Sequence, residues 1–206
     1  MVRFIQQAVK SLSSKDLLYS QIINSNNRYE QNNFANLKMK NINNVQGEVI
    51  CIEIETYKNF KKLQKKFKHE TGIDIGIKYA YRSEQDQQKL YEEFCLKYGE
   101  EYANKIVCPI GFSEHHTGLC IDVEVKINNE WVSNNEHPEI TFPILERMHR
   151  FLPQYGFILR YPKKTFITNM PYEPWHIRYV GKKIATFMRI YNLTLEELHA
   201  DCISVV

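Results

Sequence analysis

The spacing of apolar positions changes along the chain, and these changes predict short strands mixed with amphipathic helices. Residues 48–54 form a run rich in Val and Ile, which is typical of a strand. In residues 57–71, large apolar side chains recur at helical spacing, and Gly72 follows where a helix can end. Residues 73–81 then alternate between apolar and polar positions, as a half-buried strand does.

The same pattern continues to the end of the chain. Ser83 is placed to cap a helix over 84–98, and Thr194 with Glu197 forms a capping box for a last helix. Further strands are expected at 119–127, 156–161 and 174–180, and further helices at 143–155 and 184–191. Strands and helices do not alternate regularly, which favours an α+β fold with a small, mostly antiparallel sheet and flanking helices.

Residues 1–47 differ in character from the rest of the chain. They are rich in Asn, Gln, Ser and Lys, with a helical pattern only within 4–23. We therefore interpret 1–47 as an N-terminal extension or cap, and 48–206 as the compact domain.

Composition narrows the class of protein. Apolar residues make up 43% of the 206 residues, enough for a buried core, and the net charge of +3 is too small to favour nucleic acid as a partner. The lysines of 57–71 are interpreted as a solvated helix face. We expect no membrane span and no secretory signal, since polar residues interrupt every apolar run.

The five cysteines are odd in number and form no Cys-x-x-Cys pair. Most have apolar neighbours, where a free thiol behaves as a small core residue. Unpaired thiols and the absence of a signal together predict a cytoplasmic protein.

Two segments carry residues suited to metal chemistry: Ser-Glu-His-His-Thr-Gly-Leu-Cys-Ile-Asp at 113–122, and Glu-Pro-Trp-His at 173–176. A hydrolytic zinc site uses three nitrogen or carboxylate ligands and leaves a fourth position open. His115, Asp122 and His176 can meet if the chain reverses at Gly118, with Glu173 close enough to act as a base. Spacing alone leaves the alternative open, because a single histidine is more often a packed residue and a single acid a surface or capping one.

The two segments together resemble the signature of the VanY-type D-alanyl-D-alanine carboxypeptidases, and most of all the fused VanXY-type D,D-peptidases of vancomycin resistance. The resemblance covers roughly residues 75–185. It includes Tyr-Arg-Ser-Glu-Gln-Asp-Gln at 81–87, Ser-x-His-x-x-Gly-x-x-x-Asp at 113–122, and Glu-x-Trp-His at 173–176.

The resemblance implies a role for seven residues in a zinc site in a cleft on the sheet. Zn²⁺ would bind to His115, Asp122 and His176, with Glu173 as the catalytic base and Arg82 stabilising the oxyanion. Ser113 and Gln87 match positions that line the substrate cleft. His116 matches a position that does not bind metal. Cys120 stands where the family usually has alanine, and we expect only a packing change there.

The resemblance also implies the activity. The expected reaction is removal of the last D-Ala from peptidoglycan precursor peptides ending in D-Ala-D-Ala, with the free dipeptide as a second substrate. Two alternatives stay open: an L,D-carboxypeptidase or cell-wall endopeptidase on the same metal core, and a zinc-holding domain that binds peptide without turnover. Of these, the endopeptidase would not require a C-terminal carboxylate.

Overall fold

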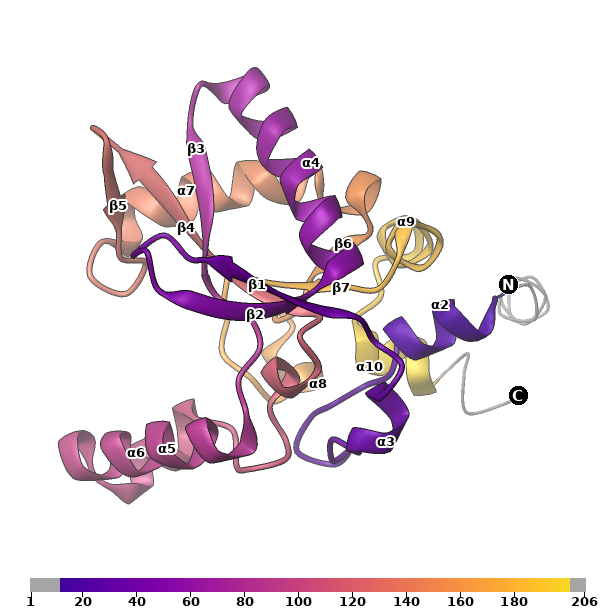
Figure 1. Ribbon diagram of the computed structural model, residues 1–206, viewed down its shortest axis with the longest axis vertical. Helices are drawn as coiled ribbons and strands as arrows, with labels where there is room; N and C mark the ends of the chain where they lie inside the picture. Colours follow the sequence, from indigo (N-terminus) through magenta and orange to yellow (C-terminus); the bar gives the residue numbers. More distant parts are fainter. Residues whose placement is uncertain (1–11, 201–206) are drawn as a thin grey trace.

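The computed structural model describes residues 12–200 and contains two antiparallel sheets (Figure 1). The larger sheet has the strand order β3-β4-β7-β6, with β5 also paired to β4, and the smaller sheet pairs β1 with β2. This confirms the predicted α+β class with antiparallel strands. The strands are β1 (Met39–Asn43), β2 (Val49–Glu53), β3 (Asp74–Tyr79), β4 (Cys120–Ile127), β5 (Glu130–Val132), β6 (Phe157–Leu159) and β7 (His176–Tyr179).

Helices flank the larger sheet (Figure 1). The α-helices are α2 (Ser14–Tyr19), α3 (Gln31–Phe34), α4 (Ile54–Thr71), α5 (Glu84–Tyr98), α6 (Glu100–Ile106), α7 (Pro138–His149), α8 (Thr165–Thr168), α9 (Lys182–Tyr191) and α10 (Leu195–Leu198). Two 3₁₀ turns, η1 (Glu114–Thr117) and η2 (Leu152–Tyr155), complete the described elements.

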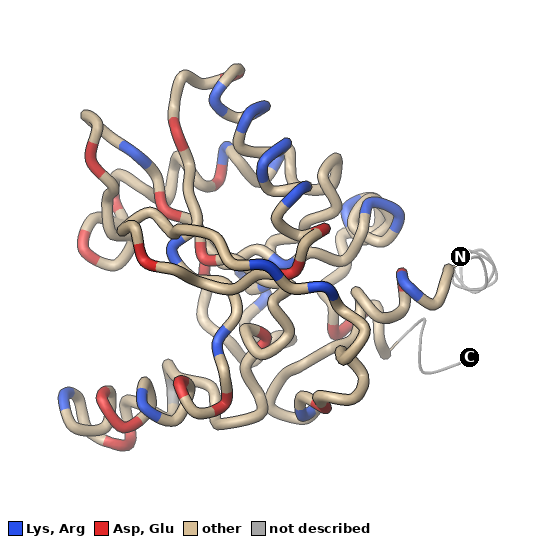
Figure 2. The backbone as a smooth tube through the Cα atoms, viewed as in Figure 1, with Lys and Arg blue, Asp and Glu red and all other residues tan. Residues whose placement is uncertain are grey.

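Helix α4 forms as its sequence predicts. The Glu53 carboxylate caps its first turn by accepting from the Thr56 N–H, and Gly72 ends it at a φ of 74°. Its apolar side chains Phe60 and Leu63 are buried, whereas all of its lysines except the half-buried Lys66 are exposed. Figure 2 shows these lysines recurring along the helix. The lysine-rich pattern is therefore a solvated face.

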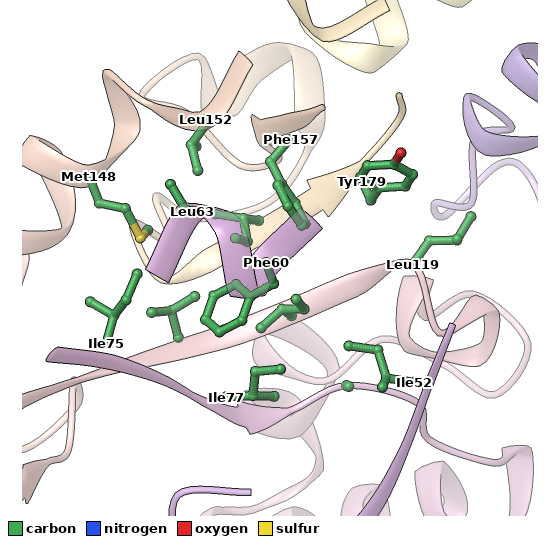
Figure 3. Packing of buried hydrophobic residues seen from close by; sticks show 14 of the residues in the cluster. Ile52, Phe60, Leu63, Ile75, Ile77, Leu119, Met148, Leu152, Phe157 and Tyr179 are labelled. Carbon is green, nitrogen blue, oxygen red and sulfur yellow. The ribbon is translucent and has the colours of Figure 1, made fainter. Parts of the chain in front are cut away.

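The core lies between α4 and one face of the larger sheet (Figure 3). Residues on a strand point alternately to its two faces. In β4, Ile121, Val123 and Val125 point into this core, where they meet α4 and the end of α7. Cys120 and Asp122 consequently point to the opposite face, which the core leaves free for a site.

Helix α5 has the predicted bounds. Its apolar face packs mainly on α6, and the pair extends away from the sheet (Figure 1). Tyr98 is 49% exposed and stacks near Phe94 and Tyr102, with ring centroids 5.5 Å and 5.3 Å away. The amphipathic pattern was real, but its partner is a short helix that the sequence analysis did not predict.

The helix expected at 143–155 is wrong in its bounds. It begins at Pro138, whose ring suits a first helical position, and ends at His149, with η2 as a separate turn up to Gly156. Part of the stretch expected at 4–23 lies outside the described residues, and only α2 is described within it.

The segment before residue 48 packs against the rest of the chain. Tyr19, Ile23 and Phe34 are buried in the main core, and β1 pairs along the length of β2. The division into an extension and a domain at residue 48 stays a prediction. Among the helices of residues 12–200, none has both the length and the apolar character needed to cross a bilayer.

Candidate metal centre and active-site cleft

One cavity of about 770 Å³ brings together all the residues to which the sequence analysis assigns a role. They come from four parts of the fold: the loop after β3, the start of α5, the η1–β4 segment, and the loop leading into β7. They are Arg82, Gln87, Ser113, His115, Asp122, Glu173 and His176.

Strand pairing places two of these side chains opposite each other. Asp122 of β4 is the register partner of His176 of β7, so both side chains point to the face away from the core. Asp122 Oδ1 lies 3.0 Å from His176 Nδ1.

His115 reaches the same point from the η1 turn. Ser113 caps this turn, and Gly118 ends it in the left-handed region at a φ of 69°, which turns the chain into β4. The His115 Nδ1–H donates to the carbonyl of Ala80, and its Nε2 lies 3.3 Å from Asp122 Oδ2. A histidine whose second nitrogen is held by a carbonyl is the usual arrangement of an oriented metal ligand.

The polar atoms at this point fit a bound cation. Asp122 Oδ1 is buried and 3.0 Å from an imidazole nitrogen, yet it has no hydrogen-bond partner. The carboxylate oxygen and the imidazole nitrogen lie close to each other without a hydrogen bond between them, which is the arrangement of two ligand atoms around one ion. Two imidazoles and a carboxylate are donors that zinc accepts in catalytic sites. The residues present therefore fit zinc.

The charges of the cluster reinforce one another. Burial would lower the pKa of His115, but Cys120 and Asp122 outweigh it and raise that pKa to about 9. Burial likewise opposes ionisation of Asp122, yet His115 and His176 hold the pKa of its carboxyl well below the usual range.

Glu173 lies beside the cluster at the start of the turn into β7. Its backbone N–H donates to the carbonyl of Tyr161 at 3.1 Å, and its Oε2 is 3.7 Å from His176 Nδ1. Burial raises the pKa of Glu173 to about 7, and the Asp122 charge adds to the rise although His176 opposes it. A carboxyl with a pKa near neutrality can both accept and return a proton.

Arg82 and Gln87 form a linked pair at the cavity wall. Arg82 Nη1 donates to Gln87 Oε1 at 3.0 Å, and Gln87 Nε2 donates to the Cys108 carbonyl at 2.7 Å. The backbone N–H of Arg82 also donates to the backbone carbonyl of His115 at 3.0 Å. The guanidinium is thereby held in the cavity that also contains His115, Asp122 and His176.

His116 is occupied elsewhere. Its Nδ1 lies 2.8 Å from the Arg82 carbonyl, and its Nε2 accepts from the Gly111 N–H at 3.2 Å. Both ring nitrogens have backbone partners, which agrees with the expectation that His116 does not bind metal.

Glu114 has a role that the sequence analysis did not assign. Its fully buried carboxylate accepts from Arg160 Nε at 2.7 Å and lies 2.9 Å from Arg178 Nη1. Burial opposes ionisation, but these two guanidinium groups hold the pKa of Glu114 well below the usual range. Its other oxygen, Oε2, is 3.8 Å from His176 Nε2, and neither atom has a hydrogen-bond partner.

Glu114 is thus part of a buried ionic network behind His176. Arg160 also binds Glu196 of α10 through two parallel hydrogen bonds of 3.0 Å and 2.7 Å. Arg178 Nη2 donates to the carbonyls of Tyr19 and Gln21. Residues 114, 160 and 178 received no role from the sequence, because their partners are far away along the chain.

Cys120 is closer to the cluster than expected. Its sulfur and one nitrogen each of His115 and His176 all lie within 4.8 Å of one another. Burial raises the pKa of a thiol, but the two histidines outweigh it and lower the pKa of Cys120 to about 7. The sequence analysis treated this residue as packing alone. Its position two residues before Asp122, on the same strand face, was the available signal.

Known proteins share this arrangement of segments. Residues 50–182 match the family model described as VanY: D-alanyl-D-alanine carboxypeptidase. The bifunctional D-Ala-D-Ala dipeptidase and D-Ala-D-Ala carboxypeptidase VanXYC of Enterococcus gallinarum is 36% identical over 138 residues, which are 63% of this chain and 69% of that protein. The putative carboxypeptidase YodJ of Bacillus subtilis (strain 168) is 35% identical over 140 residues, 61% of this chain but only 45% of that protein.

The fold is also shared with solved structures. The D,D-dipeptidase VanXYg, in complex with a D-Ala-D-Ala phosphinate analog, has a TM-score of 0.72 at 26% identity over 92% of this chain and 74% of that one. A VanY mutant from the VanB-type resistance cassette, in complex with Zn(II), has a TM-score of 0.69 at 26% identity over 87% and 98%. The LdcB LD-carboxypeptidase has a TM-score of 0.64 at 33% identity over 73% and 69%.

The match to the family model extends over more than half of the chain, and it includes every residue of the cluster described above. The protein therefore belongs to the VanY D-alanyl-D-alanine carboxypeptidase family.

Proposed function

We propose that this protein is a zinc peptidase that removes the C-terminal D-Ala from peptidoglycan precursor peptides ending in D-Ala-D-Ala, and that also cleaves the free dipeptide. One observation carries the proposal: two histidines, an aspartate and a glutamate of raised pKa meet in one large cavity. Family membership supports the substrate class.

In this proposal His115, Asp122 and His176 hold the metal. A zinc ion bound there supplies Lewis acidity for the scissile carbonyl and increases the acidity of water. Glu173 takes the proton of the attacking water and delivers it to the nitrogen of the leaving D-Ala. Arg82 donates to the oxygen that becomes negative during the attack, and Ser113 and Gln87 line the cleft beside it.

The direct test is mass spectrometry after incubation of the zinc-loaded protein with three substrates. These are a stem pentapeptide ending in D-Ala-D-Ala, the tetrapeptide ending in a single D-Ala, and free D-Ala-D-Ala. We expect release of one D-Ala from the pentapeptide, cleavage of the dipeptide, and an unchanged tetrapeptide. Activity on neither D-Ala-D-Ala substrate, with zinc bound, would refute the proposal.

The L,D-carboxypeptidase is the second candidate, because LdcB resembles this chain at 33% identity. In that case the tetrapeptide, whose D-Ala follows an L-centre, would be cleaved in preference to the pentapeptide. The same incubation therefore separates the two functions.

Arg82 provides the next prediction. Arg82→Ala should reduce kcat by roughly 10²- to 10³-fold, the loss expected when an oxyanion donor is removed. Arg82→Lys should restore little of this, because an ammonium lacks the planar fork that also binds Gln87. Steady-state kinetics test this, with the exposed Arg150→Ala as the charge-matched control. A change in KM alone would make Arg82 a substrate anchor instead.

Glu114 should control zinc affinity without touching the metal. Glu114→Gln removes the negative charge that faces His176 Nε2. Loss of a group that orients a metal-binding histidine in this way typically costs about 10- to 100-fold in metal affinity. The matched control is Glu196→Gln, because Glu196 also pairs with Arg160, whereas the acid that faces His176 Nε2 is Glu114. Zinc titration and thermal melting separate the two effects. Equal loss of zinc affinity in both variants would reduce Glu114 to a general stability role.

We also propose that the protein acts in the cytoplasm. Four described cysteines, Cys51, Cys95, Cys108 and Cys120, are free thiols, which persist in reducing compartments. Fractionation of cells that carry the natural gene tests this, and recovery of the activity outside the cytoplasm would contradict it.

A further inference from the structure

The metal-binding cluster contains a sulfur that the proposed mechanism does not use. Cys120 is completely buried, points to the same strand face as Asp122, and approaches both histidines. We propose that the Cys120 thiolate is an alternative to Asp122 as the third ligand of this metal centre, which gives the site a second ligand set for cations that bind sulfur well, such as Zn²⁺, Cd²⁺ and Co²⁺. The inference rests on the proposed metal centre but not on its peptidase activity.

The geometry meets the requirement for a shared ion. Around one tetrahedral zinc, nitrogen and sulfur ligands lie roughly 3.4–3.6 Å apart, as follows from Zn–N of about 2.0 Å and Zn–S of about 2.3 Å. The Cys120 sulfur and the two imidazole nitrogens are within 4.8 Å of one another. Side-chain rotations that move these atoms by about an ångström would bring all three within bonding distance of one ion.

A second observation points to a ligand at the same place. Asp122 Oδ1 is buried and faces His176 Nδ1 at 3.0 Å, yet it has no hydrogen-bond partner. Buried polar atoms without partners are rare and costly, and a bound cation would satisfy them. The cluster therefore contains an unpartnered carboxylate oxygen that could bind a cation, in addition to the sulfur.

The two histidines can thus complete their coordination in two ways. With Asp122 the set is nitrogen and oxygen only, whereas with Cys120 it includes a soft thiolate, which favours zinc, cadmium and cobalt over hard ions such as magnesium. Binding through sulfur releases the thiol proton to solvent, since a metal-bound thiol is deprotonated. Because Cys120 can take the place of Asp122, loss of the aspartate should leave a competent three-ligand site.

The test is absorption spectroscopy of the Co²⁺-substituted full-length protein. We expect a sulfur-to-cobalt charge-transfer band in the near ultraviolet, in addition to the visible bands of the metal. Cys120→Ala should lose the charge-transfer band and keep the visible bands, because His115, Asp122 and His176 still hold cobalt. The matched control is Cys108→Ala, which removes a cysteine of the same cavity that lies outside the ligand group and should keep the band.

Metal retention gives an independent readout. Asp122→Ala should still bind Cd²⁺ at one equivalent, and the Asp122→Ala/Cys120→Ala pair should bind none. Circular dichroism of each variant shows that it is folded.

The outcomes distinguish this inference from the peptidase proposal. A zinc protein that cleaves D-Ala-D-Ala but shows no sulfur band with cobalt would overturn the role of Cys120 alone. A sulfur band in a protein without peptidase activity would support the thiolate ligand and refute the proposed function. A wild-type protein that binds no cobalt would overturn the Cys120 ligand together with the metal centre.

Discussion

His115→Ala and His176→Ala are each expected to abolish both stoichiometric zinc binding and hydrolysis. Either change leaves only one imidazole beside Asp122, and the two histidines are the donors common to both ligand sets of the cluster. Atomic absorption of the purified proteins measures the zinc, and D-Ala release from the pentapeptide measures the activity. This is the largest effect that we predict, because the whole reaction depends on the metal.

The matched control for this experiment is His116→Ala. His116 is the sequence neighbour of His115 and is equally buried, but its two nitrogens are occupied by the backbone of Arg82 and Gly111. It should lose some stability and keep its zinc. Zinc loss in the His116 variant with zinc retained in His115→Ala would show that the wrong histidine had been assigned.

Glu173→Gln is expected to keep zinc and lose nearly all turnover. The amide has the shape of the carboxyl, so the loop into β7 should be undisturbed, but it cannot accept the proton of water. Loss of a general acid–base group typically costs about 10²- to 10⁴-fold in rate. Measurement of kcat per bound zinc, with zinc content determined on the same sample, isolates this effect from metal loss.

A buried acid on the same sheet provides the control. Glu124→Gln changes a carboxylate of β4 that is 6% exposed and lies 3.5 Å from Lys78, outside the cavity. Its kcat per zinc should stay close to that of the unmodified protein. Full turnover per zinc in Glu173→Gln would assign the base role to another residue.

Much of this site could be predicted from sequence because its parts are local. Asp122 and His176 were expected on neighbouring strands, and Gly118 indicated the turn that brings His115 to them. Helix α4 was equally readable, since its apolar spacing, its cap and its final glycine agree. Family resemblance added Arg82, Gln87 and Ser113, and the roles of all seven site residues remain predictions.

What the sequence could not reveal depends on contacts between distant segments. The Glu114 carboxylate is 46 residues from its partner Arg160, and no local pattern links them. Cys120 lies near His176 because β4 pairs with β7, and this pairing cannot be read from the sequence. The packing partner of helix α5 could not be predicted for the same reason, because an amphipathic pattern does not identify which element will cover it.

The hydrogen bonds from Arg178 to the N-terminal segment determine where the chain can be shortened without loss of stability. Its guanidinium is fully buried and holds the carbonyls of Tyr19 and Gln21, while its other side meets Glu114 behind His176. A fragment beginning at residue 48 would leave that buried charge without its two carbonyl partners, beside the Glu114 carboxylate that faces His176. A shortened version of the protein should therefore begin before Tyr19, although the match to the family model begins some thirty residues later.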